Sequence, residues 1–147
     1  MPIAIRNIRK IETMASIRKE ITVRAGVEQV WDAMRDLGAL HTRLVPGFVL
    51  NTELESGARI VTFANGRMVR ERIVSIDDAA RRLVWSTTGD PLTHHNAAAQ
   101  VMEDSDGSTR IVWIADLLPD TVASAIDQMM DQGMAAMLTA LNQLAEE

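Results

Sequence analysis

The side chains in this sequence best suited to proton transfer are its three histidines and one glutamate, Glu71. His94 and His95 are adjacent in PLTHHNAAAQV, His41 lies in ALHTRLVPGF, and Glu71 lies in RMVRERIVSI. An imidazole titrates near physiological pH, so each histidine is a candidate acid or base. His41 could equally gate a cavity or bind the polar head of a ligand.

Strand geometry argues against a metal site on the histidine pair. Neighbouring residues in a strand point to opposite faces, so His94 and His95 cannot both line one pocket without a bulge. The chain has no cysteine to supply a thiolate or a disulfide. It also lacks a phosphate-cradling glycine loop, a dinucleotide fingerprint and a nucleophile elbow. We therefore expect neither a metal nor a cofactor.

The histidine strand has two possible registers. If Val101 faces inward, His95 and two alanines share its face, and the alanines leave room for a ligand. In the other register, Asn96 and Gln100 are the polar groups within a pocket. We favour the register with His95 inside.

Glu71 shares its strand face with Val69 and Ile73, on the side that we expect to face the cavity. A carboxylate on an apolar face is costly to bury unless it is paired. Unpaired, Glu71 would be a candidate general acid or base. The alternative is neutralisation by an arginine on its own or an adjoining strand, for which the candidates are Arg59, Arg67, Arg70 and Arg72.

Composition restricts the class of protein. The chain has 147 residues, 47% of them hydrophobic, which predicts one domain with a substantial core. A net charge of −5 argues against a nucleic-acid partner. No apolar run approaches the roughly 18 residues of a membrane span. The absence of cysteine fits a reducing compartment, and we expect a cytoplasmic protein.

The hydrophobic pattern predicts the order strand, helix, short helix, six strands and a long helix. Alternation over 16–23 indicates a half-buried strand, and spacing over 26–36 indicates an amphipathic helix. From 47 to 118 successive strand patterns are separated by turn signals, among them Asn65-Gly66, a two-residue hairpin signal. Residues 120–145 predict a helix of about seven turns, capped by Asp120 or Thr121.

We expect residues 1–14 to be an N-terminal extension, or else a short extra strand or helix, and residues 15–147 to be a single domain. A seven-stranded antiparallel sheet must bury its apolar face, and only the last helix is long enough to cover it. A bent sheet wrapped around that helix leaves space between them. Methionines in the helix adapt to irregular apolar shapes, and Gly133 indicates close approach by a strand or a ligand.

Three sequence segments resemble the START-like, helix-grip (SRPBCC) superfamily, which includes polyketide cyclase/dehydrase-like and lipid-transport proteins. They are VEQVWDAMRD, VRERIVSIDDAARRLVW and DGSTRIVWIADLLPD, and the resemblance extends over about 15–146. It implies an α+β fold in which the sheet grips the last helix. Members of the superfamily bind lipids, hormones or polyketides, cyclise or dehydrate them, or bind proteins. The resemblance therefore implies a ligand of one of these three kinds, or else a protein partner.

We therefore expect a small hydrophobic or amphipathic ligand between sheet and helix. The predicted ligand-binding residues are His41, Phe48, Phe63, Glu71, Trp85, His95, Trp113, Met130, Met134 and Met137. One alternative is an enzyme of the cyclase or dehydratase type, with His95, Glu71 and His41 as candidate catalytic residues. Another is a protein-interaction module with a vestigial cavity.

The outward face of the predicted sheet carries apolar residues where solvent is expected. Val112 and Ile114, and by its strand position Val84, fall on this face. An exposed apolar patch indicates a partner surface. A second copy of the chain, forming a homodimer, is the partner that we expect.

Overall fold

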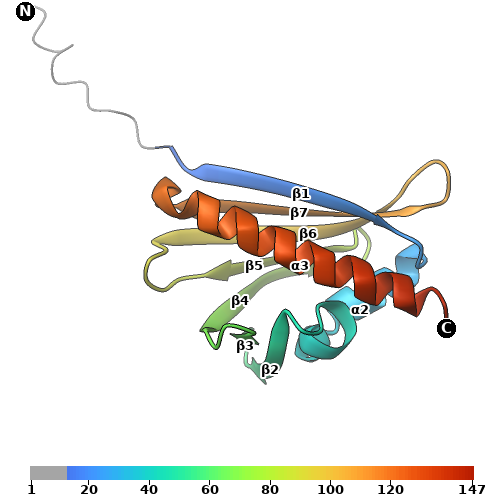
Figure 1. Cartoon of the computed structure of the whole chain (residues 1–147), viewed down its shortest axis with the longest axis horizontal. Coiled ribbons are helices and arrows are strands. Elements are labelled where there is room, and N and C mark those ends of the chain that lie inside the picture. The colour runs from blue at the N-terminus through green and yellow to red at the C-terminus, as the bar shows by residue number, and fades with distance from the viewer. Residues whose placement is uncertain (1–12) are drawn as a thin grey trace, which may run out of the picture.

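One curved sheet and one long helix dominate the structure, a computed structural model that describes residues 13–147 (Figure 1). The seven strands are antiparallel in the order β1-β7-β6-β5-β4-β3-β2. Their bounds are β1 Ala15–Val23, β2 Val49–Glu55, β3 Ala58–Phe63, β4 Met68–Asp77, β5 Arg82–Thr87, β6 His94–Glu103 and β7 Thr109–Leu118. The helix-grip architecture expected from the sequence is confirmed. The predicted extension lies almost wholly outside the described residues.

The helices differ from the prediction at their ends. Helix α2 spans Val27–Arg35, and the short helix after it divides into η1, Leu37–Ala39, and η2, Leu40–Leu44. Helix α3 spans Ala123–Leu144 and follows the 3-10 turn η3, Asp120–Val122. The predicted cap is wrong, because Val122 occupies the cap position and no side chain caps the helix. Asp120 and Thr121 are themselves part of the preceding turn.

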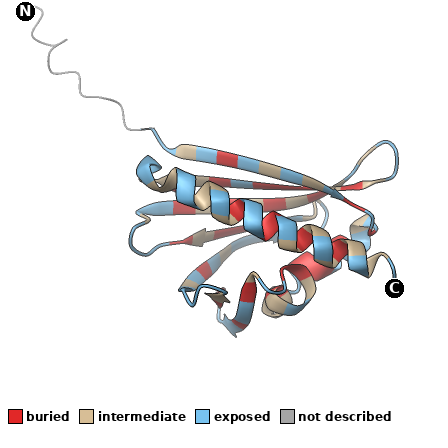
Figure 2. Ribbon diagram, in the orientation of Figure 1, coloured by how far each residue is buried: buried red, intermediate tan, exposed pale blue. Residues whose placement is uncertain are grey.

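Helix α3 covers the concave face of the sheet, and its buried residues lie on the side that faces the strands (Figure 2). A Cβ atom added to Gly133 would lie 2.9 Å from Cζ3 of Trp113 and 3.1 Å from Cε2 of Phe48. The close approach predicted for Gly133 is therefore made by two aromatic side chains. Glycine at this position lets the helix lie directly on the indole of β7.

The hairpin between β3 and β4 is not the two-residue type that Asn65-Gly66 predicts. The Phe63 amide donates to the Arg67 carbonyl, which leaves a three-residue loop, and Gly66 takes φ +86° within it. A left-handed glycine in such a loop is a common alternative to the two-residue turn. This loop pairs Arg59 with Glu71, whereas a two-residue turn would have shifted the register by one residue.

The outward apolar patch that the sequence predicts is mostly absent from the described surface. Val84 and Val112 point outward but are each only 6% exposed, while Ile114 is 37% exposed. Val112 lies between Glu20 of β1 and Gln100 of β6 in the sheet register. These residues do not supply the exposed dimer surface that the sequence suggested.

An ion-pair cluster connects α3 to the edge strand β1. Nζ of Lys19 lies 2.8 Å from Oδ1 of Asp127 and 2.9 Å from Oδ1 of Asp131. Hydrogen bonds to Asp127 and then to Asp131 raise the pKa of the Lys19 amine above its ordinary value. The cluster therefore holds the N-terminal half of α3 over the concave face.

Replacing Lys19 with methionine is expected to lower Tm and to loosen the N-terminal half of α3. Methionine keeps an apolar stem but loses the attraction to both carboxylates. In 1 M salt, where the screening length is about 3 Å, the difference in Tm between the wild type and Lys19→Met should decrease. Arg18→Met, on the outward face of the same strand, is the matched control. Equal losses of Tm in Lys19→Met and Arg18→Met would contradict the conclusion that the Lys19 cluster holds α3 in place. Equal protection of α3 from hydrogen exchange in the two variants would contradict it as well.

None of the helices within residues 13–147 is long and apolar enough to cross a membrane.

Candidate functional site

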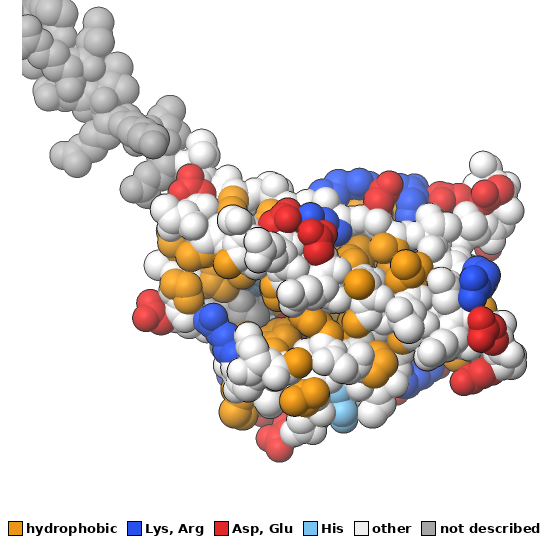
Figure 3. Space-filling model, viewed as in Figure 1, with side chains coloured by type: hydrophobic (Ala, Val, Ile, Leu, Met, Phe, Trp, Pro, Cys, Tyr) orange, Lys and Arg blue, Asp and Glu red, His pale blue; other side chains and the backbone are white. Residues whose placement is uncertain are grey.

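A small apolar pocket lies beneath α3, between the concave face of the sheet and the segment around η2. Its volume is about 60 Å³, and apolar surface dominates its walls. Figure 3 shows hydrophobic side chains gathered on this face below α3, where the surface is hollowed. The lining residues are Met34, Leu40, Leu44, Val45, Phe48, Val49, Arg59, Phe63, Glu71, Leu83, Trp85, Ala99, Trp113 and Met137.

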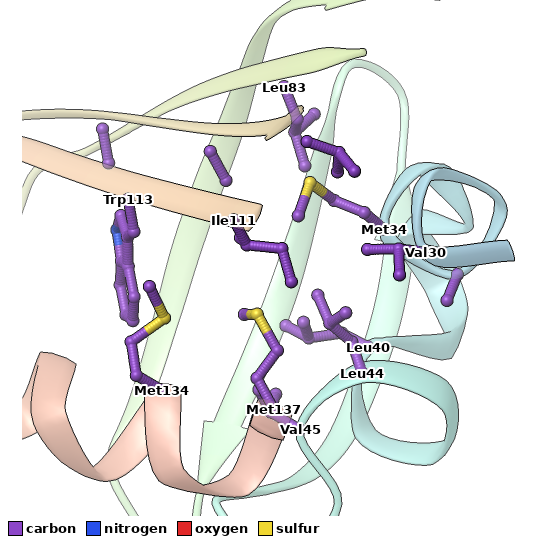
Figure 4. Close-up of a cluster of buried hydrophobic side chains, with 14 of the residues drawn as sticks. Val30, Met34, Leu40, Leu44, Val45, Leu83, Ile111, Trp113, Met134 and Met137 are labelled. Carbon is purple, nitrogen blue, oxygen red and sulfur yellow. The ribbon is translucent and has the colours of Figure 1, made fainter. Parts of the chain in front are cut away.

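The space between sheet and helix is filled to a greater extent than the sequence suggested. In Figure 4 the side chains of Trp113, Met134 and Met137 reach from β7 and α3 into the middle of the cluster. Pockets for drug-sized ligands hold roughly 300–1,000 Å³. A ligand of polyketide size therefore requires some of these side chains to move. Methionine has three rotatable bonds and can do so at low cost.

A buried ion pair is the main polar feature of the pocket wall. Nε of Arg59 donates to Oε1 of Glu71 at 2.8 Å, and the two side chains are 4% and 10% exposed. Nη1 of Arg59 also donates to the Leu37 carbonyl at 3.3 Å, and its guanidinium lies 6.0 Å from the ring centroid of Trp85. Of the two alternatives for Glu71, the structure has the neutralised one, with Arg59 as the partner.

Two phenylalanines line the side of the pocket nearest the turn before β2. The rings of Phe48 and Phe63 meet edge to face, with centroids 5.4 Å apart. Both are only partly buried, unlike the strand residues behind them. Phe48 directly follows Gly47, whose φ of +87° sets the direction of the chain into β2. Phe48 therefore lines the pocket directly after this turn.

His95 lies on the inward face of β6, in the favoured register. It is 7% exposed, and its Nδ1 has no hydrogen-bond partner within the described structure. Burial lowers the pKa of the imidazole below its ordinary 6.5, and the charge of His94 acts in the same direction. His95 is therefore neutral at physiological pH. It does not belong to the lining of the pocket.

The buried His95 is expected to make the protein sensitive to mild acid. The unfolded chain takes up a proton at the ordinary pKa, whereas the folded state resists it. The contribution of His95 to the free energy of unfolding is therefore at its maximum above about pH 6.5. It decreases as pH falls toward the lowered pKa of the folded state, by at most about 1.4 kcal/mol per pH unit. Urea unfolding at pH 7.5 and pH 5.0 measures this, with His95→Gln expected to flatten the loss.

His94→Gln is the matched control for that experiment, since His94 is exposed on the other face of the same strand. It should keep most of the wild-type acid sensitivity, because burial, the larger cause of the lowered pKa of His95, is unchanged in this variant. Carboxylates with a lowered pKa, such as Asp78, also reduce stability when they are protonated, but at lower pH. Their effect is the same in every variant, so it does not change the difference between variants. Identical losses in wild type and His95→Gln would show that His95 does not titrate on unfolding.

His41 is placed differently from the prediction. It is half-buried in η2, where its Nδ1 lies 3.1 Å from Oγ1 of Thr52 on β2, and it does not line the pocket. The neighbouring Arg43 binds Asp32 and Asp36 through its guanidinium, so its charge is satisfied on the surface of α2. The contact with Thr52 engages one ring nitrogen of His41 outside the pocket.

Of the ten residues predicted to bind a ligand, six line the pocket: Phe48, Phe63, Glu71, Trp85, Trp113 and Met137. Met130 and Met134 are buried in the core beside it. Arg59 and Met34 line it without having been predicted to bind a ligand. Met34 falls on the same apolar stripe as Trp31 in α2, and that stripe was the available signal.

The fold and pocket define a helix-grip domain with an apolar interior site, and sequence comparison then gives the family. The chain belongs to the family described as polyketide cyclase / dehydrase and lipid transport, which it matches over residues 14–146. No protein among the curated sequences matches it.

Solved structures share the fold at low sequence identity. XoxI from Bacillus cereus is 19% identical, with a TM-score of 0.79 over 89% of this chain and 98% of its own. A norcoclaurine synthase point mutant from Thalictrum flavum, in complex with a transition-state analogue, is 21% identical, with a TM-score of 0.70 over 93% and 98%. The ZhuI aromatase/cyclase from a Streptomyces species is 18% identical, with a TM-score of 0.69 over 90% and 94%.

Proposed function

We propose that this chain binds a small hydrophobic or amphipathic molecule, lipid- or polyketide-like, between the sheet and α3. The observation that carries the proposal is the pocket beneath α3, an apolar enclosure with one buried charged pair in its wall. Apolar walls with few polar groups are typical of small-molecule sites, because burial supplies affinity and the polar groups fix orientation. The family description, which includes cyclases and lipid transport, supports the same class of ligand.

Entry requires the pocket to open from its resting volume. The partly exposed Phe48 and Phe63 form the side that can open, and Met137 forms the part of the wall that can reshape. The strands behind them are held by the sheet hydrogen bonds and stay in place. We propose that a ligand displaces the Phe48 and Phe63 rings and then lies against Trp85 and Trp113, whose rings are 6.2 Å apart.

Native mass spectrometry of the freshly purified full chain tests the proposal. We expect an added mass of a small molecule that disappears on denaturation. Ala99 is buried in the pocket lining, so Ala99→Leu should abolish the added mass, whereas Ala98→Leu, one residue away on the outward face, should retain it. An adduct that persists in Ala99→Leu would place binding elsewhere. No adduct, with a stable protein partner instead, would favour an interaction module.

A cyclase or dehydratase activity is the second candidate, favoured by the fold shared with an aromatase/cyclase and a norcoclaurine synthase. His41 or His95 and Glu71 would then be acid and base. In the resting structure Glu71 binds Arg59 and His41 contacts Thr52, and no hydrogen bond joins any two of these three candidates. Of the three, His95 is the group with a buried ring nitrogen, Nδ1, that has no hydrogen-bond partner.

Incubation with aromatic polyketide-like ketones separates the two candidates. Turnover that disappears in His95→Ala, and in a folded Glu71→Gln variant, would identify an enzyme. Saturable binding of the same ketones without any product would identify a carrier. Circular dichroism of each variant distinguishes a lost reaction from a lost fold.

A further inference from the structure

Two buried polar atoms of the described structure have no hydrogen-bond partner, and both lie on the concave face of the sheet. They are Nδ1 of His95 and Nε1 of Trp113, in side chains that are 7% and 8% exposed. The indole nitrogen can only donate. A buried donor without an acceptor costs about 1–3 kcal/mol, and native proteins rarely leave one unless a water or ligand supplies the acceptor.

The free indole N–H of Trp113 points toward one end of the concave face of the sheet. Figure 4 shows the nitrogen of Trp113 on the side of the ring away from Ile111. Inward positions alternate along β7, so that side is the one nearer Ala115. Ala115 pairs with Ala97 on β6, and both alanines are at most 1% exposed. His95 is the next inward residue along β6, beyond Ala97.

The strip between the two free nitrogens therefore has a floor of two methyl groups. Both alanines are at most 1% exposed, so the strip is closed in the resting structure and a ligand reaches it only by displacing the side chains that cover it. Trp113 also lines the pocket, so its ring separates the pocket from this strip, and a ligand that moves the ring gains access to the indole N–H. A purely hydrocarbon ligand would leave the indole N–H unsatisfied, whereas a ligand with an oxygen acceptor would satisfy it.

We propose that the ligand carries a hydrogen-bond-accepting oxygen, such as a ketone carbonyl, that binds the indole N–H of Trp113 over the Ala97–Ala115 pair. The inference rests on the proposed ligand-binding function and narrows its ligand class from any small hydrophobic or amphipathic molecule to one with an oxygen acceptor within reach of Trp113. Trp113 acts as a specificity residue, and the neutral His95 supplies the second polar position at the far end of the strip.

A matched pair of probes, 1-tetralone and tetralin, tests the proposal on the full chain. They share one carbon skeleton and differ by the carbonyl, and burial alone favours the more apolar tetralin. We expect the wild type to bind 1-tetralone roughly tenfold more tightly than tetralin. In Trp113→Phe the ratio of the two dissociation constants should fall to within about twofold of one, or reverse.

Trp85→Phe is the matched control, because Trp85 lines the same pocket but is not one of the two unsatisfied groups. It should weaken both probes and keep their ratio. The Trp113 indole cross-peak in a 1H–15N spectrum should move downfield with 1-tetralone and not with tetralin. The Trp31 cross-peak, bonded to Asp78 at 2.9 Å, is the internal reference.

Equal binding of the two probes, or an unchanged ratio in Trp113→Phe, would overturn the inference while leaving the pocket proposal intact. An unmoved Trp113 cross-peak under saturation with 1-tetralone would also overturn it, and would assign the N–H to a bound water. Failure of both probes to bind the wild type would contradict the proposed function itself, and the inference with it.

Discussion

Glu71→Leu is expected to destabilise the protein by about 3–5 kcal/mol, since it leaves the charge of Arg59 buried without its partner. Arg59 and Glu71 are 4% and 10% exposed in their side chains, so water cannot replace the lost contact. Urea unfolding at pH 7.5 measures the loss. The same variant should lower the affinity for 1-tetralone, because the apolar pocket wall then carries an unpaired guanidinium.

The double variant Arg59→Met/Glu71→Leu distinguishes a broken pair from poor packing. Replacing both partners with apolar residues of similar volume is often close to neutral, so the double variant should recover most of the loss. The exposed pair Arg70–Glu55, joined at 2.9 Å, is the surface control, and Glu55→Leu should change stability by less than about 1 kcal/mol. A double variant as unstable as Glu71→Leu would show that the charge is not the cause.

Gly133→Ala is expected to destabilise the protein although alanine is the better helix former. Helix propensity favours alanine by about 1 kcal/mol. The new Cβ would lie 2.9 Å from Trp113 and 3.1 Å from Phe48, and forcing extra volume into a packed core typically costs about 1–3 kcal/mol. Both rings line the pocket, so their displacement should also reduce ligand affinity. Thermal unfolding and probe titration measure the two effects.

The variant Trp113→Phe provides the background that isolates this clash. Phenylalanine lacks the indole atoms nearest to Gly133, so Gly133→Ala should cost about 1 kcal/mol less there than in the wild type. An equal cost in both backgrounds would mean that the contact with Trp113 is not responsible. A stabilising Gly133→Ala in the wild type would mean that α3 does not lie against the indole.

The sequence predicted the element order well because each segment has a clear period and a clear turn signal. Alternation in IRKEITV and the apolar stripe through Met130, Met137 and Leu141 are local properties, and the structure has them as a strand and a helix. The inward face of β6 followed from Val101 by parity. Gly133 was informative because glycine inside a helix requires a reason, which the Trp113 contact supplies.

The strand register between β3 and β4 and the volume of the pocket could not be predicted from the sequence. Four arginines were candidate partners of Glu71, and the choice of Arg59 depends on the three-residue loop at Asn65-Gly66. A two-residue turn would have placed Arg72, not Glu71, opposite Arg59. The pocket volume depends on rotamers of Trp113 and Met137, which no sequence pattern encodes. His41 was predicted to bind a ligand, and its contact with Thr52 could not be predicted from the spacing of residues.

Methyl NMR of the full chain labelled at its methionine methyl carbons tests the central claim most directly. During titration with 1-tetralone, the methyl signals of Met34 and Met137, which line the pocket, should shift and saturate together. The signal of Met68, 64% exposed on β4, should not move. Shifts at Met68 with none at Met34 and Met137, or no saturable shift at any methionine, would contradict ligand binding between the sheet and α3.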